Sequence, residues 1–505
     1  MRERFPEPQG EPQAKRQGLQ AALGLALAAR LLPFLYGWEH YGDAPVRIEL
    51  AERWARAPHL WRGFLEAYQY GPLHLTLLGM VLRVLPDRFY APRLLSLAAG
   101  MLSIWLIWRL ALRTAGPTAA LVAACGLALS PLHIQSSTTG ASEALFLALL
   151  LGAIEVFLAF EATLVPALLL GAACLMRYDG LLYVGLISLL WLRERGLLRS
   201  AALFFIATAP MLFWLWLNWH FTGDALAPIH HIDQDHRELA AMGLHWFGSL
   251  RYRAYCLAYW PIAVCGVATP LLGLASMAGA ARALWTRSEG YRLAALAWIP
   301  AAYFTVRGAV LADFRPMSRF ALVAATLSLP FAWSALERLR WRAAAMALTV
   351  AALVATPMAL AAVSWNRNGS LAEWARPLSP ISSLPPGVES AALWLREHAG
   401  ADDYVLVEGV WDYLDVPLIF AAHLPDDQWI RQGWTLDFEA RLQRHRPTLA
   451  VLLYQGDLHN DRRASPSATE LAERFSFDGA PFCRQASFVY ASVYRRCDLS
   501  PTPTR

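Results

Sequence analysis

Long apolar runs restrict what this chain of 505 residues can fold into more than any other feature. The runs are roughly 17–25 residues long, which at 1.5 Å per helical residue matches the ~30 Å hydrocarbon core of a bilayer. Hydrophobic residues fill 56% of the positions and charged residues only 16%, whereas soluble domains have about 25% charged residues. The sequence therefore predicts an all-α polytopic protein embedded in a membrane. No basic run or stacking pattern indicates nucleic-acid binding.

We expect about eleven membrane-spanning helices, followed by a soluble tail. The expected spans are 18–36, 92–112, 117–134, 143–160, 163–177, 180–193, 200–219, 256–281, 292–307, 319–336 and 343–364. No small-residue cleavage site follows the first span, so we interpret it as retained. The predicted organisation is an N-terminal tail 1–17, a transmembrane domain 18–364 with a first outer loop 37–91, and a tail domain 365–505.

Segment 72–86 is apolar, but it has only 15 residues, is bounded by prolines and contains His74 and Arg83. If this segment does not cross the bilayer, the arginine-rich short loops and the basic N-terminus all fall on one side. The positive-inside rule identifies that side as the cytoplasm. We therefore expect an interfacial helix at 72–86. The protein is then a multi-pass protein of the plasma (inner) membrane, with its N-terminus cytoplasmic and its tail domain extracytoplasmic.

The tail domain alternates helix and strand patterns. Helices are expected at 389–398, 436–445 and 467–475, strands at 404–408 and 448–454, and a closing β run at 487–494. Such alternation predicts a small soluble α/β domain. Cys483 and Cys497 flank the closing run, and two interpretations remain open: a disulfide formed in an oxidising compartment, or two unpaired thiols.

Polar residues gather at the outer ends of the expected spans, while the span centres are largely apolar, with Glu155 as an exception. The polar clusters lie at 39–43, 133–143, 177–179, 230–236 and 307–319. Pumps and transporters usually bury ionisable groups near the bilayer midplane, at broken helices. A site at one membrane face instead favours an enzyme.

The order of several short motifs resembles that of a known family. The motifs are Gly42-Asp43-Ala44, Tyr70-Gly-Pro-Leu-His, the Arg93 segment, Leu129-Ser-Pro-Leu-His, Ala141-Ser-Glu143, Arg177-Tyr-Asp179-Gly and Ser318-Arg319-Phe320. From about residue 20 to its end, the chain is similar to the GT-C fold glycosyltransferases that use polyprenol-phosphate sugars. This branch, glycosyltransferase family 39-like, holds aminoarabinose transferases and protein O-mannosyltransferases. The latter have an Asp-Glu pair where Ala44 follows Asp43 here, which argues against a protein acceptor.

The resemblance implies an inverting hexosyl- or pentosyltransferase. Its donor would be a polyprenyl-phosphate-linked sugar, its acceptor a lipid, glycan or protein at the outer face, and its general base the first-loop acid, Asp43. The chemistry independently requires a carboxylate that takes the acceptor proton and arginines that hold the departing phosphate. The alternatives are a transporter or flippase of polyprenyl-linked sugars and a scaffold protein. The long acidic first loop and the soluble tail favour the enzyme.

Each candidate site residue also has a structural interpretation. Asp43 can simply turn the chain, Arg177 can pair with Asp179 across a tight connection, and Glu143 can stabilise a helix N-terminus. Arg315 and Arg319 precede an inward-running span, where they can hold a lipid phosphate or anchor the span at the interface. The candidate catalytic residue is Asp43, and the substrate-binding candidates are Glu39, Glu143, Arg177, His230, His231, Arg315 and Arg319.

The run 230–236 has the residue types of a metal site but not the spacing of a zinc signature, so a solvated loop is the favoured interpretation. Asp43 and Glu143 could jointly hold a divalent metal. The sequence requires no cofactor, and it leaves the use of a metal open.

Overall fold

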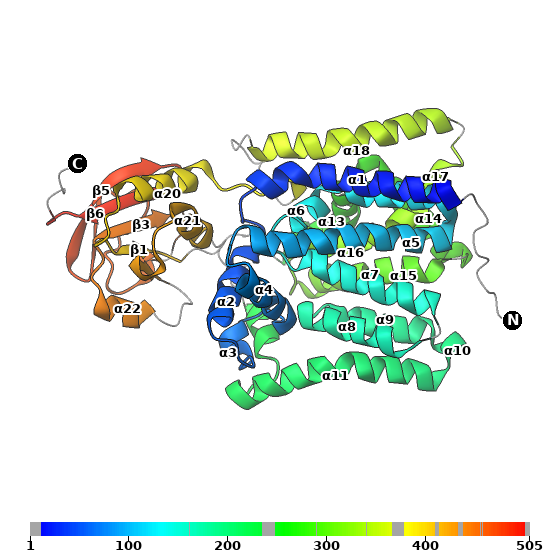
Figure 1. Cartoon of the computed structure of the whole chain (residues 1–505), viewed down its shortest axis with the longest axis horizontal. Coiled ribbons are helices and arrows are strands. Elements are labelled where there is room, and N and C mark those ends of the chain that lie inside the picture. Colours follow the sequence, from blue (N-terminus) through cyan, green and yellow to red (C-terminus); the bar gives the residue numbers. More distant parts are fainter. Residues whose placement is uncertain are drawn as a thin grey trace. The chain divides into compact units, whose positions relative to one another are not determined.

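The computed structural model describes residues 12–160, 162–234, 248–288, 290–339, 341–365, 378–409, 414–432, 438–454, 456 and 458–499 (Figure 1). The chain divides into two compact units. Unit 1 comprises Met1–Gly37 and Leu50–Ser382, and unit 2 comprises Trp38–Glu49 and Ser383–Arg505. The boundary in the first outer loop falls inside helix α2 (Ala44–Arg56), whose first six residues belong to unit 2.

Unit 1 is helical throughout its described part. Its elements are α1 (Pro12–Tyr36), α3 (Phe64–Ala67), α4 (Pro72–Val84), α5 (Tyr90–Ala128), α6 (Pro131–Ser136), α7 (Glu143–Ala159), α8 (Leu164–Met176), α9 (Gly180–Leu190), α10 (Leu192–Arg195), α11 (Leu197–Thr222), α13 (Leu250–Ala268), α14 (Pro270–Thr286), α15 (Tyr291–Val306), η1 (Arg307–Leu311), α16 (Ser318–Ser328), η2 (Leu329–Phe331), α17 (Ala332–Leu336) and α18 (Arg342–Trp365). Within the described ranges, 6 segments are long and apolar enough to cross a membrane. The protein is therefore an integral membrane protein.

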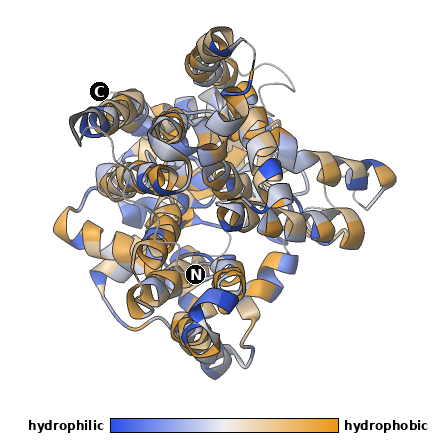
Figure 2. Ribbon diagram, turned by 90° about the vertical axis from the view of Figure 1, so that its right-hand side faces the viewer, coloured by the Kyte–Doolittle hydropathy of each residue, from blue (hydrophilic) through white to orange (hydrophobic). Residues whose placement is uncertain are grey.

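Many residues of the outer helices are hydrophobic, which suits contact with lipid (Figure 2). On α1, Leu31 and Leu32 are 54% and 63% exposed, and on α18 Leu348 and Met358 are 61% and 67% exposed. A soluble protein rarely leaves such continuous apolar faces in water. Helices α7 and α8 pack side by side in the unit, and α8 also packs against α11.

A glycine separates two of the expected spans, and a proline shortens the second of them. The expected spans 92–112 and 117–134 lie on α5, which bends at Gly116, a residue with φ 87° just before Pro117. The second of these spans ends earlier than expected, at Ala128, because Pro131 starts the separate helix α6 and Ser130 caps it.

The expectation of one uninterrupted span at 256–281 is wrong. The structure has two helices there, α13 and α14, separated at Thr269, which has φ 72°. Pro270 has no amide hydrogen to donate and disfavours the helical conformation of the residue before it. These two effects end α13 and start a new helix.

Helix α4 occupies the segment that the sequence analysis placed at the membrane surface. It has 13 residues, which corresponds to a length of about 20 Å, shorter than the ~30 Å hydrocarbon core. His74, Leu75 and Leu78 are fully buried on one face of the helix.

Unit 2 is an α/β unit with a mixed sheet. Its elements are α20 (Pro386–His398), β1 (Val405–Val407), α21 (Asp415–Ala422), η4 (Asp426–Gln428), β2 (Trp429–Arg431), α22 (Phe438–Arg444), β3 (Leu449–Leu453), η5 (Leu458–Asn460), β4 (Arg474–Phe477), β5 (Ala480–Phe488) and β6 (Ala491–Arg496). The strand order is β2-β1-β3-β6-β5-β4. Strands β2, β1 and β3 run parallel, and β3, β6, β5 and β4 run antiparallel.

Alternating side chains place a separate apolar core on each face of this sheet. Val405 and Val407 pack with helices α20 and α21 on one face. Leu406, between them, packs on the other face with Phe438 of α22 and the β4–β5 aromatic residues. This period of two is what a pleated strand imposes, and it confirms the predicted α/β domain.

Two expectations for the tail domain are wrong. Residues 467–475 form no helix, since the phenol of Tyr494 donates to the carbonyls of Thr469 (2.9 Å) and Ala472 (2.8 Å), which helical amides would otherwise occupy. The run 487–494 is not one strand but a hairpin, with Tyr490 at φ 69° in its turn. The sequence analysis also overlooked α21, β2 and β4.

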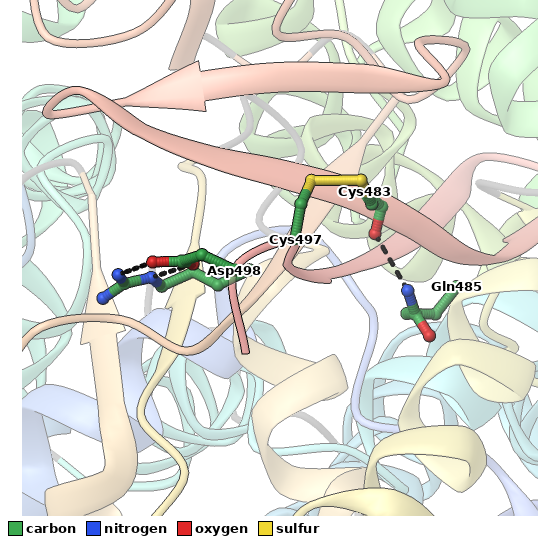
Figure 3. The surroundings of a disulfide bond; sticks show 5 residues. Cys483, Gln485, Cys497 and Asp498 are labelled. Carbon is green, nitrogen blue, oxygen red and sulfur yellow. Dashed lines mark hydrogen bonds and ion pairs between the residues drawn. A yellow bond between two sulfur atoms is a disulfide. The ribbon is translucent and has the colours of Figure 1, made fainter. Parts of the chain in front are cut away.

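The two tail cysteines form a disulfide. Cys483 of β5 bonds to Cys497, which follows β6, with a Cα–Cα distance of 5.3 Å (Figure 3). The structure thus decides between the two interpretations left open by the sequence. The bond fastens the end of the chain to the antiparallel half of the sheet.

Candidate functional site

A buried ion-pair cluster joins the ends of three helices in unit 1. Arg177 follows α8 directly and donates to Glu143, the first residue of α7, with an Nη1–Oε1 distance of 2.7 Å. Its Nε donates to Asp179, just before α9, at 3.0 Å. The three side chains are only 7–14% exposed. Both structural interpretations from the sequence therefore hold, because Arg177 pairs with Asp179 and Glu143 lies at a helix N-terminus.

A second arginine lies close to this cluster. The guanidinium carbons of Arg177 and Arg319 lie 5.1 Å and 5.8 Å from the ring centroid of Phe320. Arg319 is near enough to Arg177 for its charge to act on it, and it is half-buried in the first turn of α16. Two arginines and two carboxylates thus meet around one aromatic ring. Sequence spacing indicated the arginines but not the ring that they share.

The second half of the first outer loop packs against this region. The carbonyl of Tyr70 accepts from the hydroxyl of Tyr178 at 3.3 Å, and that hydroxyl accepts from the indole N–H of Trp214 at 3.1 Å. Gly71 lies so near the end of α8 that a Cβ there would be 2.1 Å from the carbonyl oxygen of Leu175. Only glycine fits this contact, which explains the Tyr-Gly-Pro motif.

The described part of the 230–236 run makes protein contacts of its own. His230 Nδ1 lies 2.8 Å from the Asp224 carboxylate at an exposed position. His231 is hydrogen-bonded to the Tyr68 hydroxyl of the first loop, and its ring packs edge-on against Tyr68. Asp235 and His236 lie outside the described residues.

Asp233 from the same run pairs with Arg307 at the end of α15, at 3.2 Å. Arg307 also pairs with Asp313, at 3.2 Å. Arg315, two residues further on, is exposed and lies near the α13 tyrosines 252, 255 and 259. The structure therefore separates the two arginines that sequence reasoning treated alike. Arg319 is beside the Arg177 cluster, and Arg315 is beside a row of tyrosines.

Asp43 and Glu39 belong to unit 2. Asp43 is half-buried and directly precedes α2, and its carbonyl accepts from the amide of Arg47 at 3.0 Å. Gly42 beside it has φ 50°, and the amide of Ala44 bonds back to Tyr41, so the predicted turn is present. Glu39 is 2% exposed. The turn places an acid at the start of a helix, where the helix dipole stabilises its charged form.

Two arginines of unit 1 that are not among the candidate site residues are fully buried. Arg30, within α1, donates to the Ser137 hydroxyl (2.8 Å) and lies 2.7 Å from His133 Nδ1 of α6, so that expected span is not apolar throughout. Arg93 of α5 donates to the carbonyls of Phe34 (2.8 Å) and Gly37 (2.5 Å) at the end of α1. Arg93 thereby holds the point where the first outer loop begins.

A search for metal ligands among the described residues finds no group of three or more histidine, cysteine, aspartate or glutamate side chains able to hold an ion. The acidic side chains of the Arg177 cluster are neutralised by arginine instead. Arginine forks beside aromatic rings, such as those of Arg177 and Arg319, are groups that can recognise an anion.

Comparison with known proteins places the fold in a class. No protein-family model matches the chain, and no curated protein matches it by sequence. Solved structures do match, and they are GT-C fold glycosyltransferases. The chain is thus a polytopic membrane protein with the predicted GT-C fold.

The first of these structures is ArnT from Cupriavidus metallidurans bound to undecaprenyl phosphate. It matches with a TM-score of 0.60 and 16% identity, over 98% of this chain and 100% of that chain. The same protein in the apo state gives a TM-score of 0.58 and 16% identity, over 95% and 98% of the two chains. The Archaeoglobus fulgidus oligosaccharyltransferase in complex with Zn and sulfate matches with a TM-score of 0.52 and 14% identity, over 86% of this chain and 67% of that chain. At these identities the likeness establishes the fold.

Proposed function

We propose that this protein is a membrane glycosyltransferase that moves a sugar from a polyprenyl-phosphate donor to an acceptor. The observation that carries the proposal is the end-to-end match with ArnT, which was crystallised with a polyprenyl phosphate. The arginines gathered around Phe320 support it, because a lipid-linked donor leaves behind a phosphate that needs cationic hydrogen-bond donors.

In this proposal the donor phosphate is bound by Arg319, with Arg315 as a second contact. Phe320 holds Arg319 and Arg177 against one ring, and Glu143 and Asp179 keep the Arg177 side chain in place. Arg177 then contributes positive charge beside the phosphate. His230 and His231 are proposed as acceptor contacts next to the first loop.

Asp43 is proposed as the general base. It takes the proton from the acceptor hydroxyl while that oxygen attacks the anomeric carbon and the bond to the phosphate breaks, so the configuration inverts. The turn before α2 presents its carboxylate at partial exposure, where an acceptor can reach it. Glu39 is proposed as a substrate contact, since its deeper burial suits it less to proton transfer.

The direct test is sugar transfer by the purified full chain with a panel of polyprenyl-phosphate sugars, run with and without a metal chelator. General base catalysis contributes about 10²–10⁴-fold, so Asp43→Asn should lose most turnover and keep donor binding. Glu39→Gln is the control and should lose much less. Full activity of Asp43→Asn together with inactivity of Glu39→Gln or Glu143→Gln would assign the base elsewhere. Movement of an intact lipid-linked sugar across the bilayer, without transfer, would identify a flippase.

We also propose that the N-terminus is cytoplasmic and that unit 2 faces the opposite side, as the one-sided arginine loops predict. The test is thiol labelling of the variant Asp402→Cys in intact cells. Asp402 lies at an exposed position of unit 2. An impermeant maleimide should label this variant and leave the parent chain unlabelled, because the parent's tail cysteines are joined in a disulfide. Labelling only after membrane disruption would reverse the proposed orientation.

A further inference from the structure

The segment that carries Asp43 belongs to the C-terminal α/β unit although it lies more than 300 residues before it. Residues Trp38–Glu49 group with Ser383–Arg505 in unit 2, whereas the rest of the first outer loop groups with the membrane helices. Ala44, Val46 and Ile48 in this segment are no more than 1% exposed. The segment is therefore an integral part of the α/β unit.

The α/β unit holds this segment at points on both sides of Asp43. Before it, Trp38 packs against the apolar core that α20 and α21 form with the sheet, and His40 Nδ1 lies 3.2 Å from the carbonyl oxygen of Ser383. After it, Glu49 of α2 pairs with Arg431 at the end of β2. The turn at Gly42-Asp43 thus lies between two attachments to the α/β unit.

The second attachment is a buried fork. Arg431 pairs through one guanidinium nitrogen with Glu49 and through another with Asp415 of α21. The Arg431 side chain is 7% exposed and that of Asp415 2%. Burial by itself would lower the pKa of Arg431, but the two carboxylates outweigh it and raise the pKa, so the cation is retained.

A buried ion pair of this kind adds little stability over well-packed apolar residues, while it does define one geometry. The planar guanidinium fixes both carboxylates in direction as well as distance. Arg431 itself lies on the sheet, where Asp415 of α21 holds its guanidinium, and Glu49 links that guanidinium to α2. Since α2 begins directly after Asp43, the orientation of α2 determines where the Asp43 carboxylate points.

We infer that the C-terminal α/β unit is a clamp for the catalytic loop, and that Arg431 is a positioning residue that sets Asp43 through Glu49 and α2. This inference rests on the proposed role of Asp43 as the general base. It assigns a task to a domain whose role the sequence left open. An error of about 1 Å in the placement of a reacting group can cost on the order of 10²-fold in rate.

The test compares two arginines of unit 2 that each bind two carboxylates. Arg431→Met should lower kcat by about 10–100-fold with KM for the lipid donor unchanged, because the base is misplaced while the donor site is intact. Arg431→Lys should recover part of kcat, since a lysine reaches only one carboxylate. Arg463→Met is the matched control, because Arg463 binds Asp461 and Glu439 and touches neither Glu49 nor the Asp43 turn. It should keep wild-type kcat.

A second variant covers the case in which Arg431→Met does not fold. Glu49→Gln keeps the shape of α2 and the Arg431–Asp415 pair, and it should show the same selective fall in kcat. The double variant Glu49→Gln/Arg431→Lys should lose no more than the worse single variant, because both act through one contact. Wild-type kcat in Glu49→Gln, or an equal fall in Arg463→Met, would overturn the inference.

Adding Glu49→Gln to Asp43→Asn separates this inference from the proposed function. If both hold, the second substitution changes nothing further, because the base that it would misplace is already absent. Full activity of Asp43→Asn refutes the proposed function. An inactive Asp43→Asn with an unaffected Glu49→Gln refutes the clamp alone.

Discussion

Two buried arginines, one in each unit, are each held between two carboxylates. They differ in how far away in the sequence those carboxylates lie. Arg177 binds Asp179, two residues away, and Glu143, the first residue of α7. Arg431 binds Asp415 within its own unit's C-terminal part and Glu49, which is 382 residues away in sequence. The first arrangement follows from a tight connection between helices, and the second requires the chain to return to its beginning.

The Arg177 and Arg431 clusters also differ in what we expect each arginine to do. The Arg177 cluster lies beside a second arginine, Arg319, and beside a ring that both arginines contact, and we propose that Arg319 binds an anionic ligand there. The Arg431 cluster is largely buried and connects two segments of the unit. We therefore expect substitutions at Arg177 to affect both folding and ligand binding, and substitutions at Arg431 to affect the loop geometry.

The largest effect is expected for Arg177→Met. This change leaves Glu143 and Asp179 buried without their cation, which costs about 3–5 kcal/mol when one partner of a buried pair is removed. We expect loss of thermal stability in detergent together with loss of donor binding. The matched comparison is Arg431→Met, which should leave donor binding intact. Equal donor affinity in both variants would remove Arg177 from the ligand site.

An intermediate effect is expected for Arg319→Ala. Charge-assisted hydrogen bonds contribute about 1.5–3 kcal/mol, so the loss of Arg319 should weaken binding of the lipid donor by roughly 10–100-fold. Arg319→Lys should restore part of the affinity, because a point charge cannot reproduce the planar fork. The matched variant Arg315→Ala tests the exposed arginine four residues earlier, just before α16. Unchanged donor affinity in both Arg319 variants would contradict its assignment.

The smallest effect is expected at Asp461, in the surface counterpart of the two buried clusters. Hydrogen bonds from Arg463 hold the pKa of Asp461 below its ordinary value of 3.8, although partial burial opposes this. Because the folded-state pKa is the lower one, the pair stabilises the fold above pH 4 or so and loses this contribution as the pH falls through the folded-state pKa. Solvent screening limits the contribution to about 0.5 kcal/mol.

Hydrogen exchange of the full chain in detergent, followed around η5 and β4, measures this difference. Asp461→Asn should exchange faster than the wild type at pH 7, after correction for intrinsic rates, and the difference should disappear as the pH falls through the folded-state pKa of Asp461. A difference that persists unchanged at low pH would show that Asp461 contributes through packing rather than through its charge.

Much of the membrane unit follows from the sequence, because a bilayer permits few solutions. Backbone groups in lipid must be satisfied within the segment, so a long apolar run becomes a helix whatever its neighbours do. The kink at Gly116 and the Arg177–Asp179 pair are likewise local, since they depend on residues within one or two positions. The predicted GT-C fold is confirmed by a solved structure that matches along 98% of this chain at only 16% identity.

Short elements and distant partners were decided by tertiary contacts. The run 467–475 has a helical pattern, but sheet residues such as Tyr494 and Ser492 donate to its carbonyls and keep it irregular. Strand β2, with three residues, has too little pattern to be recognised, yet its parallel neighbour β1 fixes its register at the edge of the sheet. Such elements are stable only after the sheet exists.

The sequence alone determined that this chain is a membrane-embedded helical protein with an α/β tail and polar residues grouped at span ends. Hydropathy and charge decide these features one segment at a time. Only the tertiary structure decided that Trp38–Glu49 belongs to unit 2, that Arg431 reaches Glu49, and that Phe320 lies under two arginines. Each of these depends on side chains from distant segments meeting in one place, and no local pattern encodes such a meeting.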